Sequence, residues 1–546
     1  MLEIATLRRT LRNTLLCAAL SSCLTPHVPA QSSSEAPTRE TGGRLVLVLP
    51  FDNRSGQANL SWIGDSFPDT LNQRLTSAGF LTITRDDRLF ALDHLGLPAD
   101  FKPTRATTIR MAQTLDADYV VVGSYTINNG YIAVQAQTLS VNQLRLSQPL
   151  EDSSPLDHLF DVENSIAWKV ARQIDPQFKV AQQTFLAASS GVKLAAFENY
   201  IRGTGATTSQ ERLKRLQSAV QETPNYSAAL LALGKAQFNQ RDYDQAATTL
   251  AKVPATDRLA LEANFYLGLA RFNTAKYAAA ETAFGFVASR LPLPEVVNNQ
   301  GVSASRQGKD ATALFQRAST ADPNDADYHY NLAVAFLGRG DAASSLREVE
   351  TSLKLRPNNT EATELRNRLN AANGATGPAL KAAVTAGGFD PVERIRRTYS
   401  EASFRQAAFE MDQMRATRMA TLPPTEQAAQ YVKLGNDYLS QGLVPEAEQE
   451  FQSALTADSH NAAAHASMAR IRELNANPTD SRAEADASLK LQPNVAAYLV
   501  LARLDLQANN LAASASDVGN ALRLEPTNSA ALGMKQALAT RGQSLP

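Results

Sequence analysis

A repeating arrangement of small and large apolar residues constrains this chain more than any other feature. Between residues 228 and 357, a glycine or alanine returns every 32 to 34 residues, at Gly234, Gly268, Gly301 and Ala333. Behind each comes a set of residues spaced four and three apart, which places them on one face of a helix. These sets are Ala246/Leu250/Val253, Ala280/Phe284/Val287, Ala311/Phe315/Ala318 and Ser345/Val349/Ser352.

Prolines mark the ends of these units. Three of the four sets are followed five residues later by a proline, at Pro292, Pro323 and Pro357. Proline cannot continue a helix and biases the residue before it away from helical backbone angles. The period and the two helices per unit predict a helical solenoid. Its helix pairs must stack, because no pair can bury its apolar face alone.

The unit resembles the tetratricopeptide repeat, whose pattern runs W-x2-L-G-x2-Y, then A-x3-F, then P. Residues 262–292 carry this pattern as Leu267-Gly268, Ala280, Phe284 and Pro292. Residues 431–459 carry Tyr431, Leu434-Gly435, Tyr438, Ala447 and Phe451, with Ser459 in place of the proline. The tryptophan is absent throughout, but seven copies stand in phase. The resemblance implies a solenoid whose first helices line a groove for other proteins.

The repeats divide into two predicted arrays. The first spans residues 185–371, from an atypical first copy to a polar cap helix at 361–369. Residues 372–390 are rich in glycine and alanine, which predicts a hinge. The second array spans residues 391–540, beginning with a poor copy at 391–414. It resumes the phase at Gly435, Ala469 and Ala502 and ends in a cap helix at 530–538.

Residues 1–30 have the order of an export signal. Three arginines precede a short apolar core at residues 15–20, and a small-residue cleavage site ends at Ala30. An alternative is a bacterial lipobox at residues 20–23, with Cys23 as the lipidated residue. A disordered cytosolic tail is a third, less favoured interpretation. The core is too short to span a bilayer. We predict an exported or periplasmic protein that begins at Gln31 or Cys23, with residues 31–43 as a polar tether.

Residues 44–176 predict a different kind of domain. The unbroken apolar run at 45–51 is typical of a buried strand, and residues 80–84 predict a second. Between them a helix carries Ser66-x-x-Asp69, which resembles a capping box. A further helix is predicted around residues 109–115, and Asn129-Gly130 between two apolar runs predicts a hairpin. With a last helix at 159–174, the order of elements predicts an α/β domain.

This segment resembles the amino-terminal domain of TolB and the related FlgO/CsgG-like domains of bacterial envelope proteins. The shared stretches are VLPFDN at 48–53, WIGD at 62–65, ADYVVVGSY at 117–125 and the last helix at 159–174. Such domains are often coupled to tetratricopeptide arrays, some of them behind adenylate-cyclase or kinase domains, neither of which we find here. The resemblance implies a fold and an envelope context, and it implies no defined activity.

The sequence predicts no catalytic, cofactor or metal site. The six histidines lack ligand spacing, since His460 and His465 are five residues apart and a helix requires three or four. Both cysteines, Cys17 and Cys23, precede residue 31. No glycine-rich phosphate loop or nucleophile elbow is present. Gly64-Asp65-Ser66 could hold an anion at a helix start, but helix capping is the favoured interpretation. The pair Asp52 and Asp65 is likewise better explained by turn and cap roles.

The candidate partner site is the inner face of the first helices in the first array. It consists of Leu231, Lys235, Phe238, Phe265, Leu269, Phe272, Tyr330 and Val334. The competing interpretation, which is the more common one for aromatic residues at such positions, makes them packing between repeats. The corresponding second-array residues, Asn436, Arg470 and Arg503, are polar or basic. The two arrays are therefore predicted to bind different partners.

Together these features predict an α/β domain followed by an all-α solenoid, acting as a non-catalytic scaffold for one or more envelope proteins. Because 53 Lys and Arg balance 54 Asp and Glu, no nucleic-acid partner is expected. Contact with a membrane is expected only through a lipid on Cys23. The alternative is a sensory or assembly module, in which the α/β domain binds a small molecule or lipid and the repeats relay the signal. An enzyme is the third choice.

Overall fold

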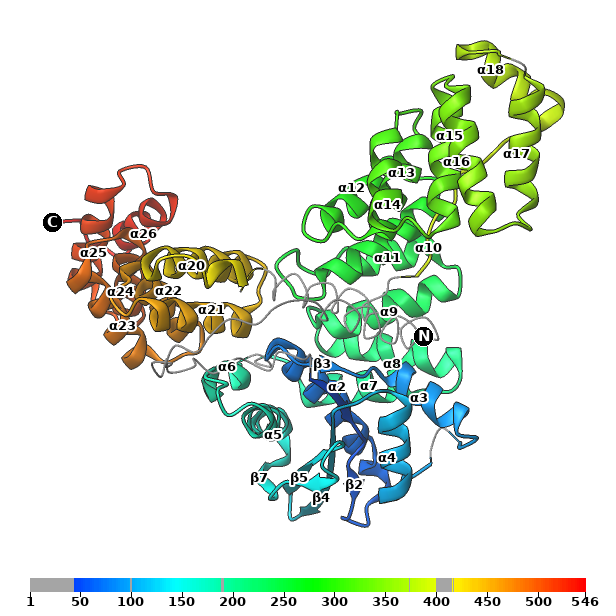
Figure 1. The fold of residues 1–546 in the computed structure, drawn as a ribbon. Coiled ribbons are helices and arrows are strands. Elements are labelled where there is room, and N and C mark those ends of the chain that lie inside the picture. Colours follow the sequence, from blue (N-terminus) through cyan, green and yellow to red (C-terminus); the bar gives the residue numbers. More distant parts are fainter. Residues whose placement is uncertain (1–43, 99–100, 188–190, 373, 399–414, 416) are drawn as a thin grey trace, which may run out of the picture. The chain divides into compact units, whose positions relative to one another are not determined.

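The computed structural model describes residues 44–98, 101–187, 191–372, 374–398, 415 and 417–546. Within these ranges an α/β region is followed by a long helical repeat region, as predicted (Figure 1). The predicted export signal with Cys23 and Ala30, the tether at 31–43 and most of the poor repeat at 391–414 lie outside them. Of the helices in the described ranges, none is both long enough and apolar enough to cross a membrane.

The α/β region contains one mixed sheet. Its strand order is β3 (Leu81–Thr82), β1 (Leu45–Val48), β4 (Tyr119–Asn128), β5 (Tyr131–Ser140) and β6 (Arg145–Leu146). β2 (Asp52–Asn53) also pairs with β4, and β7 (Leu150–Pro155) with β5. β1 is parallel to β3 and β4, whereas β4 and β5 are antiparallel. The predicted hairpin joins β4 to β5, with φ of 50° at Asn129 and 78° at Gly130.

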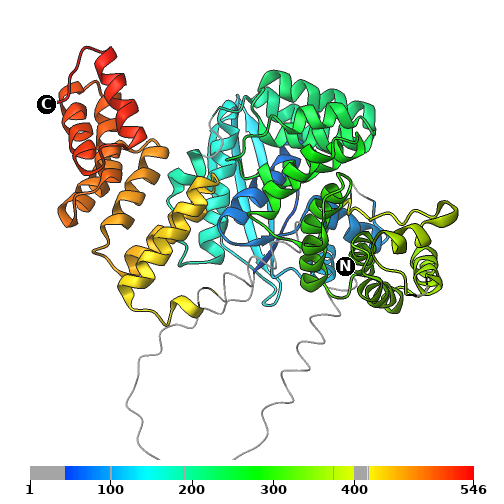
Figure 2. The same ribbon diagram turned by 90° about the horizontal axis from the view of Figure 1, so that it is seen from above.

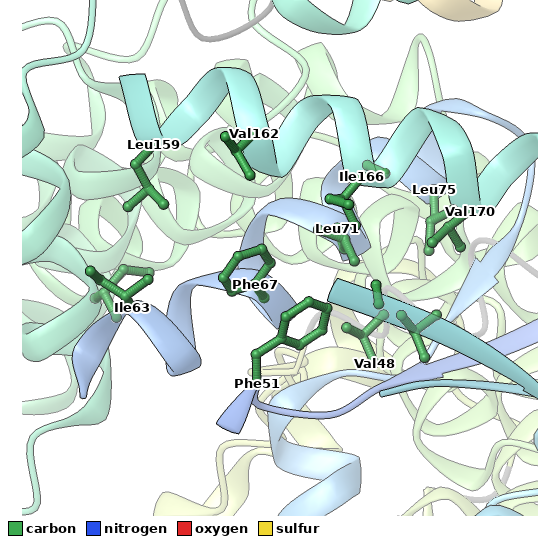
Figure 3. Close-up of a cluster of buried hydrophobic side chains, with 14 of the residues drawn as sticks. Val48, Phe51, Ile63, Phe67, Leu71, Leu75, Leu159, Val162, Ile166 and Val170 are labelled. Atoms are coloured by element: carbon green, nitrogen blue, oxygen red, sulfur yellow. The ribbon is translucent and has the colours of Figure 1, made fainter. Parts of the chain in front are cut away.

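Both faces of the sheet are covered, which explains the unbroken apolar run. Val46 and Val48 face a cluster formed with α2 (Trp62–Ser77) and α5 (Leu159–Ile174). Leu47 and Leu49 face the opposite cluster, which contains α3 (Arg85–His94) and α4 (Arg105–Thr114). Successive strand residues point to opposite faces, so a strand buried on both sides needs apolar residues throughout. Figure 3 shows the first cluster, where Phe51 stacks on Phe67 of α2 at 4.0 Å between ring centroids.

The predicted capping box at Ser66 is wrong. A short 3-10 helix, η1 (Ala58–Leu60), leads into α2, which therefore begins at Trp62, four residues before Ser66. Ser66 is inside the helix and fully buried, and its hydroxyl donates to the Glu163 carboxyl group and lies 2.8 Å from Ile63 O. Gly64 lies in the first turn of α2, where its N–H already donates to Ser61 O at 3.0 Å, and Asp65 and Ser66 follow it inside the helix, so the predicted anion site at a helix start is not formed.

Glu163 of α5 is a fully buried carboxyl group. Thr70 donates to its Oε2 at 2.6 Å, and Ser66 donates to its Oε1. Burial raises the pKa of Glu163 to about 8, although both hydroxyl donors oppose the shift. Burial also raises the pKa of nearby Asp69 to about 6, against the Tyr200 hydroxyl that donates to it at 3.0 Å. A carboxyl group with a raised pKa holds its proton more tightly in the folded state.

We expect the free energy of unfolding to fall as the pH rises from about 5 to about 8. Below the pKa of an unfolded glutamate, Glu163 is protonated in both the folded and the unfolded state, so the free energy of unfolding does not depend on its titration. Above it, folding must keep a proton on Glu163 that the unfolded chain releases, which costs about 1.4 kcal/mol per unit of pH. Glu163→Gln should remove most of this slope and leave the part due to Asp69. Urea denaturation at several pH values measures it, and an unchanged slope in Glu163→Gln would contradict the assignment.

The core of the α/β region continues into the first helices of the array. These are α6 (Gln182–Ala187), α7 (Leu194–Gly205) and α8 (Ser209–Glu222). One hydrophobic cluster runs from Val46 of β1 to Ala236 of the array. Phe197 of α7 lies between Phe160 and Trp62, at 4.4 and 6.0 Å between ring centroids. Phe178 and Val180, which lie between the two predicted domains, belong to the same cluster, so the two regions share one core.

The first array continues as antiparallel helix pairs. The helices are α9 (Ser227–Asn239), α10 (Tyr243–Leu250), α11 (Ala260–Asn273), α12 (Tyr277–Ala288), α13 (Pro294–Ser305), α14 (Thr312–Ala321), α15 (Ala326–Gly338), α16 (Ala342–Leu355) and α17 (Thr360–Ala371). The stretch expected to be a hinge contains α18 (Gly377–Val384), whose Leu380 and Val384 are fully buried in a cluster with Leu365 of α17.

The second array repeats this arrangement (Figure 2). Its helices are α20 (Pro424–Ser440), α21 (Val444–Ala457), α22 (Ala462–Leu474), α23 (Pro478–Leu491), α24 (Val495–Gln507), α25 (Leu511–Leu524) and α26 (Ser529–Thr540).

The recurring small residue lets the two helices of a pair touch. A Cβ built on Gly268 would lie 2.8 Å from the Phe284 ring, and one on Gly435 would lie 2.4 Å from the Phe451 ring. Where the first helix has alanine, the second supplies a serine that donates to the alanine carbonyl oxygen, as Ser345 does to Ala333 at 2.8 Å. The period thus reflects a packing requirement between helices.

Candidate functional site

Three asparagines stand on the inner face of the first array. Asn298 and Asn299 belong to α13 and Asn331 belongs to α15, and all three are fully buried. Asn299 precedes Gly301 by two residues and Asn331 precedes Ala333 by two, so they are equivalent positions in successive repeats. A buried amide must find hydrogen-bond partners. Those partners belong to a distant part of the same chain.

An extended segment after α18 lies on these asparagines, and we call residues 391–397 the strap segment. Figure 1 shows it as the yellow-green trace that passes α15. Asn331 accepts from Arg394 N–H at 2.7 Å and donates to Arg394 O at 2.8 Å. Asn299 likewise accepts from Arg396 N–H at 2.7 Å and donates to Arg396 O at 2.8 Å. Each asparagine therefore satisfies both backbone groups of one strap residue, as a neighbouring β-strand would.

Asn298 supports this arrangement. It accepts from Asn331 Nδ2 at 2.7 Å and donates to Arg394 O at 3.0 Å. The amide group of Asn331 is thereby held between a helix side chain and the strap backbone. Because the strap is extended, residues two apart present their backbone groups to the same side. Every second strap residue therefore meets the asparagine of the next repeat: Arg394 meets Asn331 and Arg396 meets Asn299.

The side chains of Arg394 and Arg396 meet an acidic surface. Arg394 contacts Asp327 at 2.6 Å and Glu361 at 2.8 Å, and its guanidinium group lies 4.0 Å from the Tyr330 ring centroid. Arg396 pairs with Asp325 and lies 3.4 Å from Asp327. Asp325 also caps α15, which places its carboxylate at the helix end. Both arginines remain partly exposed, at 22% and 27% of their side-chain area.

The pKa values of Arg394 and Arg396 are shifted in opposite directions by their surroundings. Burial lowers the pKa of Arg394, but the hydrogen bonds to Asp327 and Glu361 outweigh it, so the net shift is upward. Burial lowers the pKa of Arg396 by more than the charges of Asp322 and Glu295 raise it. An arginine keeps its charge through shifts of this size at neutral pH. The strap therefore brings two positive charges to the acidic end of α15.

The strap residues between and before the arginines make different contacts. Ile395 packs with Phe272 and Leu314 against the buried clusters of α11 to α15. Glu393 accepts from the Ser305 hydroxyl and lies 3.8 Å from Arg306. The strap is thus recognised through backbone, acidic, aliphatic and basic contacts over four consecutive residues.

The predicted groove residues fall into two groups. Phe265, Leu269 and Tyr330 have no exposed surface, and Leu231 and Val334 are 7% and 8% exposed. Lys235 forms an ion pair with Glu262 at 2.7 Å, Phe238 packs against Tyr243 and Tyr266, and Phe272 is partly buried. Of the eight, Tyr330 lies under Arg394 of the strap segment, and Phe272 packs against the same buried cluster as Ile395.

The asparagines, Asp325 and Asp327 were missed by sequence reasoning. A signal was present, because Asn299 and Asn331 occupy the same repeat position 32 residues apart. The equivalent residue in α11 is Tyr266, so the pattern covers only two repeats. Periodicity alone does not distinguish a groove asparagine from a solvated one.

Two histidines of the repeats pair with carboxylates. His329 Nδ1 lies 2.9 Å from Glu348 Oε2, and His465 Nδ1 lies 2.6 Å from Glu484 Oε2, at equivalent places in the two arrays. The hydrogen bond to Glu348 raises the pKa of His329. In the described ranges, no cluster of three or more His, Cys, Asp or Glu side chains could hold a metal ion.

Antiparallel helix pairs in a regular stack define a helical-repeat protein. Family models described as "Tetratricopeptide repeat" match residues 213–281, 300–360 and 432–493. The chain therefore contains tetratricopeptide repeats in both arrays, and repeats of this class bind other proteins. The resemblance of residues 44–176 to TolB-like domains stays a prediction.

Solved structures match parts of the chain. The crystal structure of MamA is 17% identical and covers 29% of this chain and 94% of its own, with a TM-score of 0.27. YrrB, described as "a TPR protein with an unusual peptide-binding site", is 14% identical and covers 37% and 98%, with a TM-score of 0.28. The LpoB C-terminal domain from Escherichia coli is 22% identical and covers 21% and 84%, with a TM-score of 0.19. No curated protein sequence matches the chain.

Proposed function

We propose that this protein is a non-catalytic scaffold, exported to the bacterial cell envelope, whose first array binds an extended segment of an envelope protein. The observation that carries the proposal is the paired hydrogen bonding of Asn299 and Asn331 to extended backbone. Such bonds accept any sequence that can lie extended, because they use only backbone groups. The acidic and apolar surfaces beside them supply selectivity.

The export part of the proposal rests on the order of charges and apolar residues in the first 30 residues. Cell fractionation together with the intact mass of the purified protein tests it. A mass beginning at Gln31, or at a lipid-modified Cys23, supports export. An unprocessed chain in the cytosol would contradict export, and it would also exclude an envelope partner.

A photo-crosslinking amino acid placed in the groove tests the partner site. At position 272 it should form a discrete adduct with an envelope protein in intact cells, because Phe272 and Ile395 of the strap segment pack against the same buried cluster. The matched control is position 286 on α12, where Phe286 stacks on Arg290 at 3.9 Å. Equal adducts from the two positions would contradict a specific groove. The adducts are identified by mass spectrometry.

A further inference from the structure

The strap segment fills the groove with a ligand that belongs to the same chain. We propose that it is a displaceable internal ligand, and that the partner carries the same pattern of two arginines separated by an aliphatic residue. This inference rests on the proposed function of the groove. It adds that the site is closed in the resting protein and names the chemistry that opens it.

The strap and a partner segment exclude one another. Both amide groups of Asn299 and Asn331 are used by Arg394 and Arg396. Asp325 and Asp327 are paired with the same two arginines. A second extended segment could form these bonds only after the strap has left them.

The contacts of the strap suit a ligand that can leave. Its backbone bonds at Arg394 and Arg396 go to side chains, and most of its other contacts are ionic or polar. Residues 392–396 are only partly buried, unlike the core of the array. Asp327 also pairs with Arg356 at 2.7 Å, so this carboxylate keeps a partner when the strap leaves.

The strap has the advantage of being tethered. Arg368 of α17 lies 4.8 Å from the ring centroid of Phe389, which holds the chain just before the strap. A short tether gives an effective concentration on the order of millimolar. A partner segment must bind tightly enough to compete with the strap at this effective concentration, so segments that make only some of these contacts are rejected.

The surface favours arginine over lysine in the partner. Arg394 donates to both Asp327 and Glu361 while it stacks over Tyr330. Arg396 lies 5.1 Å from the Tyr328 ring centroid. A planar guanidinium group can donate in two directions and stack at once, whereas an ammonium group acts as a point charge.

The helices of the second array that the structure describes, α20 to α26, lack this recognition device. Its residues two before Gly435, Ala469 and Ala502 are Lys433, Ser467 and Val500. Lys433 has no acceptor, Val500 has neither donor nor acceptor, and Ser467 has a single hydroxyl in place of the separate oxygen and NH2 group of an asparagine amide. The internal ligand is therefore matched to the first array.

Peptide binding to the full chain tests the inference. The probe is a fluorescein-labelled peptide with the sequence of residues 389–398, FDPVERIRRT, followed by anisotropy. The variant R394E/R396E, which repels the strap from Asp325 and Asp327, should bind it at least about tenfold more tightly than the unaltered protein. Adding N299A/N331A to that variant should abolish the gain. A peptide with lysine at both arginine positions should bind the released variant about tenfold more weakly.

Equal affinity of the unaltered protein and R394E/R396E would overturn the internal ligand. A concentration-dependent dimer of the unaltered protein by light scattering would also overturn it, because the strap would then fill a second copy. If R394E/R396E does not fold, hydrogen exchange of the unaltered protein decides, since rapid exchange throughout residues 391–397 contradicts occupancy. Peptide binding without an envelope adduct at position 272 would remove the proposed function and leave the internal ligand standing. Equal amounts of envelope adduct from the unaltered protein and from R394E/R396E would overturn the internal ligand and leave the proposed function standing.

Discussion

Replacing Gly64 with alanine should destabilise the α/β region by about 3 kcal/mol or more. Gly64 lies in the first turn of α2, and a Cβ there would sit 2.3 Å from the carbonyl oxygen of Phe51. That carbonyl belongs to backbone held in place, because Phe51 N–H donates to Gly64 O at 3.0 Å. Tyr125 limits movement further, since its hydroxyl donates to Leu60 O at 2.8 Å just before the helix. The clash can be relieved only by separating the loop from α2.

Gly533→Ala is the matched control, because Gly533 also lies inside a helix. Nothing lies within 4 Å of a Cβ added there. Alanine forms helices better than glycine, so this change should stabilise α26 by about 1 kcal/mol or less. Chemical denaturation followed by tryptophan fluorescence measures the Gly64 effect, since Trp62 and Trp168 both lie in the α/β region. A Gly64→Ala protein as stable as the unaltered one would mean that the loop can move freely.

The parts of the fold that were predicted share a local cause. Apolar periodicity records which side of a helix or strand is buried, so it gave the repeats and the buried strand at 45–51. The hairpin followed from the positive φ that Asn129 and Gly130 tolerate. Helix α3 was not predicted, because its sequence RDDRLFALDH buries only Ala91 and Leu92.

The parts that were missed depend on contacts between distant residues. Ser66 has the sequence environment of a helix cap, and only the position of Glu163 on α5 shows that it faces inward. The strap offers no period, because its backbone partners Asn299 and Asn331 stand 97 and 63 residues earlier. An extended segment that is paired with side chains has no local signature. The role of Asp327 could not be predicted for the same reason. In the sequence it is an ordinary acidic residue of a first helical turn, and only the structure shows that it pairs with Arg394.

The aromatic residues of the first array separate core from groove. Phe265 has no exposed surface and meets Phe284 edge to face at 5.8 Å between ring centroids. Phe265→Ala should therefore cost roughly 3–5 kcal/mol of stability, by leaving a cavity between α11 and α12. In a repeat array the loss can appear as early melting of part of the array. Thermal melting followed by far-UV circular dichroism measures it, and an unchanged curve would show that the array can fill the space.

Phe272→Ala is the counterpart, seven residues later on the same helix. Phe272 is only partly buried, and it packs against the same buried cluster of α13 to α15 as Ile395 of the strap. Its removal should cost less stability than Phe265→Ala, because less apolar surface is lost from the interior. It should also weaken binding of the 389–398 peptide to R394E/R396E, since the aliphatic residue between the arginines loses one wall of its pocket. If Phe272→Ala instead melts as early as Phe265→Ala while peptide affinity is unchanged, both aromatics belong to the core, and selectivity for the aliphatic residue must come from Leu314.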